Sequence, residues 1–219
     1  PEAQNGAANW SCENQTPREI INTTMGSDSV RVRLSNEHGK DPVEIGAAHI
    51  ALHSQGPGIV AGSDRILKFN GRATISIPPD AVILSDQVKL DVPAAGDLAV
   101  SLFINKASAG AGIHYSAQQT SYIGAGDVTG SSSIQGPTTL TSWVFLTGVD
   151  VLVPESTTAS VAFGDSITDG ARSTVDANRR WPNVLADRLL SQRRGHRLAV
   201  VDAGIGGNRI LHDPAGNVR

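Results

Sequence analysis

A short apolar run that leads into a tight turn constrains this chain more than any other stretch. Residues 160–163 combine β-branched and aromatic side chains, which predicts a buried strand. The run ends at Gly164, and Asp165 and Ser166 follow in the turn. Open α/β sheets carry their chemistry where the strands end. The sequence therefore predicts that Ser166 is an exposed nucleophile and that Gly164 and Asp165 support its turn.

The residues that follow predict a strand–helix–strand unit. Trp181, Val184, Leu185 and Leu189 recur at helical spacing, and residues 198–201 form a second short apolar run. Two strands joined through a helix in this way run parallel. Because two strands and one helix bury too little apolar surface to be stable alone, we expect residues 156–219 to be the N-terminal portion of an incomplete α/β domain.

Residues 1–155 carry the pattern of a β-domain. Val30, Val32 and Leu34 alternate with arginines, which places apolar and charged side chains on opposite faces of a strand. Similar runs follow at near-regular spacing, at 48–52, 65–69, 73–77, 88–92, 98–104 and 143–152. This pattern predicts a β-sandwich of jelly-roll type. Residues 105–139 are either loop or a few irregular strands, and the polar segment 154–158 is the expected domain boundary.

Composition excludes several classes of protein. The 219 residues carry a net charge of −3, which gives no electrostatic case for binding nucleic acid. No apolar run is long enough for a membrane span. The single cysteine, Cys12, excludes an intramolecular disulfide. His49 and His53 are spaced for a helix but lie in a strand pattern, so we expect no metal site and no other cofactor.

Two motifs resemble one known family. Gly164-Asp165-Ser166-Ile167, extended by Thr168-Asp169-Gly170, resembles the first signature block of the SGNH (GDSL-type) esterases and lipases. Residues 200–209 resemble the second block, in which a strand runs into a glycine-rich loop that contributes to the oxyanion hole. The resemblance implies a flavodoxin-like α/β domain that starts with this βαβ unit.

The same resemblance implies roles for individual residues. Ser166 would be the nucleophile, and its own N–H and that of Gly207 would be oxyanion donors, with Gly204 as the alternative to Gly207. Asn208 and Arg209 are candidate substrate contacts, and a structural salt bridge is an equal interpretation of Arg209.

The base that should activate Ser166 is missing from these motifs. The family's Gly-x-Asn-Asp block and its final Asp-x-x-His block do not occur in residues 1–219. We interpret the histidines of the β-domain as surface or core residues, His196 as remote, and His212 as bordering the site. We therefore expect the base on the remainder of the chain, held as a second polypeptide after cleavage beside Arg219. Residues 1–219 alone would then be inactive.

The resemblance implies a secreted serine esterase that uses no cofactor. It would hydrolyse short acyl esters, including O-acetyl groups on carbohydrate, through an acyl-enzyme. The alternative is a non-catalytic carbohydrate-binding or interaction protein with a degenerate hydrolase motif. A β-sandwich beside a hydrolase can bind carbohydrate, restrict access or stabilise the enzyme. Because Trp143 and Trp181 both lie in core patterns, a packing or gating role is favoured over sugar binding.

Overall fold

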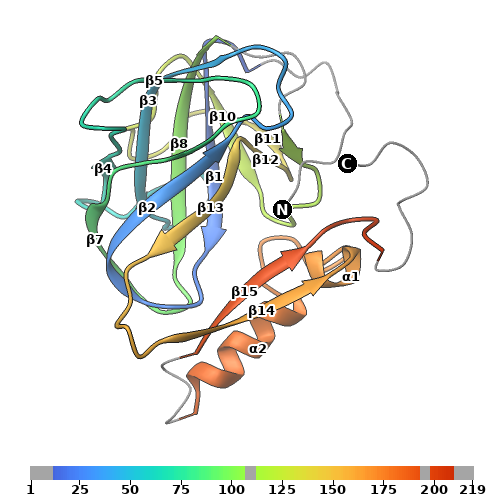
Figure 1. Ribbon diagram of the computed structural model, residues 1–219. Coiled ribbons are helices and arrows are strands. Elements are labelled where there is room, and N and C mark those ends of the chain that lie inside the picture. The colour runs from blue at the N-terminus through green and yellow to red at the C-terminus, as the bar shows by residue number, and fades with distance from the viewer. Residues whose placement is uncertain (1–11, 107–111, 193–197, 210–219) are drawn as a thin grey trace.

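The computed structural model describes residues 12–106, 112–192 and 198–209, which are mostly β-structure (Figure 1). The strands before the βαβ unit are β1 Gln15–Asn22, β2 Ser27–Ser35, β3 Val43–Leu52, β4 Arg65–Ile66, β5 Ile75–Ile77, β6 Val82–Leu84, β7 Val88–Val92, β8 Asp97–Lys106, β9 Ile113–His114, β10 Ser121–Ala125, β11 Thr138–Leu140, β12 Trp143–Val144 and β13 Leu146–Val151. The remaining elements are β14 Thr158–Gly164, α1 Ser166–Asp169, α2 Trp181–Leu190 and β15 Leu198–Gly204. His196, His212 and the loop before Arg219 lie outside the described residues.

Two antiparallel sheets make up most of residues 12–151, hereafter the β-region. The larger sheet has the order β11-β10-β1-β8-β3-β4, with β5 also paired to β3. The smaller sheet has the order β13-β2-β6, with β7 also paired to β2. A separate pair, β12-β9, lies beside the βαβ unit (Figure 1).

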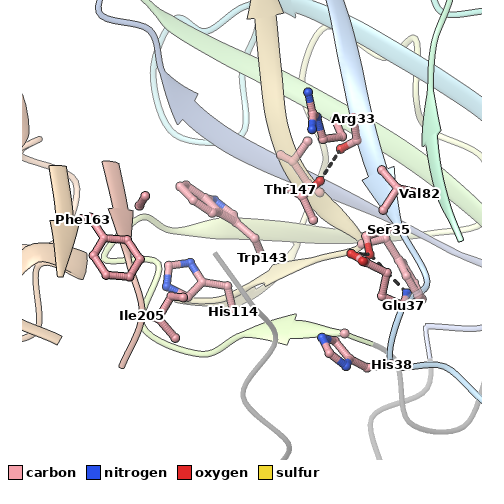
Figure 2. A pocket seen from close by; sticks show the side chains of 14 residues that line it. Arg33, Ser35, Glu37, His38, Val82, His114, Trp143, Thr147, Phe163 and Ile205 are labelled. Atoms are coloured by element: carbon pink, nitrogen blue, oxygen red, sulfur yellow. Dashed lines mark hydrogen bonds between the residues drawn. The ribbon is translucent and has the colours of Figure 1, made fainter. Parts of the chain in front are cut away.

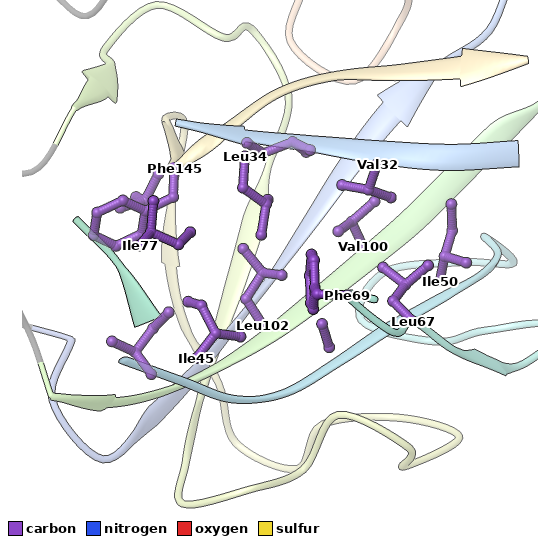
Figure 3. Packing of buried hydrophobic residues seen from close by; sticks show 14 of the residues in the cluster. Val32, Leu34, Ile45, Ile50, Leu67, Phe69, Ile77, Val100, Leu102 and Phe145 are labelled. Atoms are coloured by element: carbon purple, nitrogen blue, oxygen red, sulfur yellow. The ribbon is translucent and has the colours of Figure 1, made fainter. Parts of the chain in front are cut away.

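One apolar core joins the two sheets, as expected of a β-sandwich. Val32 and Leu34 of the smaller sheet pack together with Ile50, Val100 and Leu102 of the larger one, and all five are fully buried (Figure 3). The alternation predicted for Val30, Val32 and Leu34 is thus confirmed. Packing of this kind stabilises each sheet by about 1.5–3 kcal/mol per buried large aliphatic side chain.

The sequence interpretation of the β-region needs two corrections. The first strand it predicts contains Val30, Val32 and Leu34, whereas β1 precedes that strand and lies inside the larger sheet, between β10 and β8. For residues 105–139, where the sequence pattern leaves loop and irregular strands open, the structure has both, because β9, β10 and the start of β11 lie there. The apolar run 65–69 contributes only the two-residue strand β4, although Leu67 and Phe69 are buried in the core.

Two charged residues of β1 are completely buried. Arg18 donates to Ser101 Oγ and to the backbone carbonyls of Pro57, Thr129 and Ser131, so its guanidinium ties two loops to the sheet. Glu19 has a single partner among the described residues, the Val144 N–H that donates to its Oε1. Burial raises the pKa of Glu19 well above its ordinary value, against the effect of that hydrogen bond. Glu19 therefore keeps its proton to a higher pH in the folded protein than in the unfolded chain.

Glu19 should make the protein less stable as the pH rises. The folded state keeps the proton, whereas the unfolded chain releases it above the ordinary glutamate pKa of 4.5. The unfolded state is therefore increasingly favoured as the pH rises above that value, until the folded pKa is reached. Glu19→Gln keeps an acceptor for Val144 and does not titrate. We expect urea unfolding between about pH 5 and pH 7 to show a flatter profile in this variant.

Glu155→Gln is the matched control for this prediction, because Glu155 is exposed. Its free energy of unfolding should follow that of the wild-type protein across the same pH range. Parallel profiles for Glu19→Gln and the wild type would contradict a buried neutral carboxyl at position 19.

Cys12 is a free, buried thiol beside this carboxyl. Burial, assisted by Glu19, raises the pKa of Cys12 to about 12. The thiolate form that reacts with alkylating reagents is therefore negligible near neutral pH in the folded protein.

The βαβ unit, residues 158–204, follows the predicted pattern. β14 and β15 are parallel, and α2 contains the predicted helical stripe and packs against β15. Trp181, expected in the core, is instead 44% exposed. It is the first residue of α2, where its Nε1 donates to Thr168 Oγ1 at 3.3 Å, while Pro182 and Ala186 provide the buried contacts. Within the described residues, no helix is long and apolar enough to cross a membrane.

Candidate active site

The two sequence motifs meet at one edge of the parallel sheet. β14 and β15 pair in register from Thr158 opposite Leu198 to Gly164 opposite Gly204. Because parallel strands point the same way, the turn after Gly164 and the loop after Gly204 leave the sheet together. The predicted juxtaposition of the two motifs is therefore present in the structure.

Ser166 is the first residue of α1, directly after the end of β14. Asp165 caps this short helix, because its Oδ1 accepts from the N–H of Ile167 at 2.9 Å. Ser166 is partly exposed, and among the described residues its hydroxyl has no hydrogen-bond partner. A hydroxyl in this position is available to a base and to a substrate carbonyl.

Two glycines allow α1 to lie directly on the strand ends. A Cβ at Gly204 would stand 2.1 Å from the backbone nitrogen of Asp169. A Cβ at Gly164 would stand 2.2 Å from Thr168 Oγ1. The side chain of any other residue at either position would push α1 away, so both glycines fix the height of Ser166 above the sheet.

The glycine-rich loop after β15 is tied to the end of β14. Ile205 N–H donates to the Gly164 carbonyl at 3.0 Å, and the Asn208 side-chain amide reaches the same oxygen at 3.5 Å. Gly207 is exposed, with φ of +80°, and no described residue accepts a hydrogen bond from its N–H. The N–H of Gly204, in contrast, donates to Asp202 Oδ1 at 2.9 Å. This difference favours Gly207 over Gly204 as an oxyanion donor.

Asn208 and Arg209 end the second motif, and their side chains have different environments. Asn208 Oδ1 accepts from the Arg209 N–H at 3.0 Å, so its side chain bridges the loop. Arg209 is exposed and makes no ion pair with any described residue, which leaves its guanidinium available.

Asp169 of the first motif is a buried residue with a partner in the β-region. It is 4% exposed, and its Oδ1 lies 2.7 Å from Nε2 of His114, which is 7% exposed. His114 belongs to β9, in a segment whose composition resembles a loop, so no sequence signal pointed to this contact. The pair joins the β-region directly to the helix that carries Ser166.

Arg180 makes a second contact between the β-region and the βαβ unit. Its Nε donates to the carbonyl of Asp169 at 2.9 Å, its terminal nitrogen donates to the carbonyl of Ala117, and its guanidinium lies 5.8 Å from the Trp143 ring. Burial lowers the pKa of Arg180, with Asp202 and Asp169 acting in the opposite direction. Burial also raises the pKa of Asp202, which lies at the same interface.

The remaining described histidines do not approach Ser166 through any hydrogen bond. His49 Nδ1 contacts Asp64 at 2.9 Å, and His53 Nε2 contacts the carbonyl of Gly56 at 2.9 Å. His38 is half-buried and lines the pocket described next. Within the described ranges, no three His, Cys, Asp or Glu side chains form a group that could hold a metal ion.

A pocket of about 440 Å³ lies between the β-region and the ends of β14 and β15 (Figure 2). Its lining includes the aromatic side chains of Trp143, Phe145 and Phe163, the polar side chains of Arg33, Glu37 and His38, and the imidazole of His114. Its volume is in the range of small-molecule sites. Phe163 comes from β14, three residues before Ser166, so the pocket adjoins the candidate nucleophile although Ser166 does not line it.

Comparison with known proteins supports a hydrolase relationship for this part of the chain. A family model described as GDSL-like lipase/acylhydrolase matches residues 161–216, which contain both motifs. A search of curated proteins found no match. The family match supports a general hydrolase function.

Proposed function

We propose that this protein is a serine ester hydrolase of the SGNH type, with Ser166 as its nucleophile. The observation that carries the proposal is the register of the two parallel strands, with Gly164 opposite Gly204. Two motifs separated along the chain thereby contribute to one sheet edge a hydroxyl and a backbone N–H that have no hydrogen-bond partner among the described residues. The family match over residues 161–216 supports the same reaction class.

The proposed reaction has two steps. Ser166 Oγ attacks the ester carbonyl while a general base takes its proton, and the negative charge on the carbonyl oxygen is held by the N–H groups of Ser166 and Gly207. The adduct collapses, the alcohol leaves with the proton, and the acyl group stays on Ser166. Water then attacks the acyl-enzyme, which releases the carboxylic acid and restores the hydroxyl.

The general base and its orienting acid are proposed to come from chain segments that complete the α/β domain. One face of the β14–β15 sheet has no cover among the described residues: Val161 is 60% exposed, Phe163 68% and Val201 47%. In α/β folds both faces of a parallel sheet are covered. Further segments of the same protein on this face would give the flavodoxin-like arrangement and bring a histidine within reach of Ser166.

The proposed substrates are short acyl esters, including acetyl groups on carbohydrate. The pocket beside β14 combines aromatic surface with polar side chains, which suits a sugar alcohol next to the scissile ester. Secretion is part of the proposal, since esters of polymeric carbohydrate are met outside the cell.

The test is ester hydrolysis by the full-length protein. Release of p-nitrophenol from acetyl, butyryl and octanoyl esters, and of acetate from acetylated xylan, would be measured in parallel. We expect turnover that falls as the acyl chain lengthens, together with acetate release from the polysaccharide. Binding of deacetylated xylan without hydrolysis of any ester would overturn the proposal and favour a non-catalytic carbohydrate-binding protein.

A further inference from the structure

We propose that His114 of the β-region is a positioning residue for the nucleophile turn, acting through Asp169. The β-region would then be part of the catalytic apparatus and not a separable module. This inference rests on the proposed function, because positioning matters only if Ser166 reacts.

His114 is held on a rigid support. It pairs with Trp143 across the β9–β12 ladder, and the two rings lie 5.4 Å apart at an angle of 52°. Trp143 is itself anchored, because its Nε1 donates to the carbonyl of Ile20 in β1 at 3.0 Å. The imidazole is therefore fixed relative to the central strand of the larger sheet.

His114 in turn fixes the far end of α1. Asp165 caps the start of the helix, and the carboxylate of Asp169, its last residue, accepts from His114 Nε2 at 2.7 Å. The carbonyl of Ser166 accepts from the N–H groups of Gly170 and Ala171, so Ser166 lies within the same hydrogen-bonded turn. A helix of four residues has little stability of its own, so its position depends on contacts at both ends.

The segment after α1 is attached to the same part of the β-region. Asp176 accepts from the N–H and the hydroxyl of Thr120 at 2.6 and 2.7 Å, and Asn178 donates to Asp97 at 3.0 Å. Arg180 reaches Ala117 and lies over Trp143. These contacts hold the loop between α1 and α2. Among the described residues, the His114–Asp169 hydrogen bond is the one from the β-region that reaches a side chain of α1, whereas the hydrogen bond to Thr168 comes from Trp181 of α2.

Loss of the donor at position 114 would leave a buried carboxylate without a partner. Such a group is costly in an apolar setting, so Asp169 would turn toward water and α1 would move with it. A displacement of about 1 Å in a reacting group can cost on the order of 100-fold in rate. Because His114 also lines the pocket, its loss can change KM as well, and the positioning effect is the part of the loss in kcat that a donor in the place of Nε2 restores.

Two amide substitutions separate the hydrogen bond from the packing. In His114→Gln the amide nitrogen can occupy the place of Nε2, whereas in His114→Asn it lies near the place of Nδ1 and does not reach Asp169. With p-nitrophenyl acetate and the full-length protein, we expect His114→Asn to lower kcat by at least ~10-fold. His114→Gln should recover most of that loss.

His49→Asn is the matched control, because His49 also contacts an aspartate, Asp64. His49 belongs to β3, which lies away from α1 (Figure 1). The kcat of this variant should equal that of the wild type. Equal kcat values for His114→Asn and His114→Gln, or the same loss in His49→Asn, would overturn the inference.

If His114→Asn does not fold, Asp169→Asn provides the test, because it weakens the same hydrogen bond without creating a cavity. An unchanged kcat in Asp169→Asn would overturn the inference. A wild-type protein without esterase activity would instead overturn the proposed function.

Discussion

Replacing Ser166 by alanine in the full-length protein should abolish ester hydrolysis while leaving the fold intact. Loss of a serine nucleophile removes the acyl-enzyme route altogether, and the expected fall in kcat/KM is at least ~10⁴-fold. The hydroxyl makes no hydrogen bond with described residues, so its removal should shift the melting temperature very little. Initial rates with p-nitrophenyl acetate and a thermal melt measure the two quantities.

Ser160→Ala is the matched control for this substitution. Ser160 lies on β14, six positions before Ser166 and on an exposed site of the same strand. This variant should keep wild-type turnover. A Ser166→Ala protein that retains substantial turnover would mean that another group is the nucleophile, and the assignment of both motifs would fail with it.

Replacing Gly204 by alanine should be the most damaging small change outside the nucleophile itself. The added Cβ would meet backbone atoms of α1, 2.1 Å from Asp169 N and 2.7 Å from its Cα. Backbone cannot rotate away as a side chain does, so α1 must lift from the strand ends. We expect a loss of about 1–3 kcal/mol in the free energy of unfolding and a fall in kcat of about 100-fold.

Gly148→Ala controls for the loss of a glycine from a strand. Gly148 lies on β13, and a Cβ built there meets no atom within 4 Å. Denaturant unfolding and kcat would be measured for both variants, and Gly148→Ala should match the wild type in each. A Gly204→Ala protein with wild-type kcat would show that the height of α1 above the sheet does not matter for the reaction.

The alternating pattern predicted most of the β-region, and its failures have physical causes. Val30, Val32 and Leu34 are buried as predicted because one face of β2 meets the core. The local pattern does not predict β1, because Arg18 and Glu19 are charged residues in the sequence yet are buried in the fold. The backbone carbonyls that accept from Arg18, and the burial that raises the pKa of Glu19, come from tertiary structure and are not encoded in a local pattern.

The candidate site also has a part that the sequence predicts and a part that depends on tertiary contacts. The strand, turn and glycine-rich loop around Ser166 and Gly207 follow from local residue order, and the parallel pairing of β14 and β15 follows from the helix between them. The His114–Asp169 contact joins residues 55 positions apart and depends on how the β-region meets the βαβ unit. The predicted burial of Trp181 is wrong for a related reason. Helical spacing identifies the apolar face of a helix, but it does not show that Trp181, at the start of α2, lies where this face is no longer covered.

Covalent labelling tests the central claim most directly. The full-length protein would be treated with a fluorophosphonate, which reacts with an activated serine hydroxyl and displaces fluoride, and the adduct would be located by peptide mass spectrometry. The account predicts a single adduct on Ser166, lost on denaturation before labelling. An adduct on a different residue, or no adduct on a folded protein that still hydrolyses esters, would contradict it.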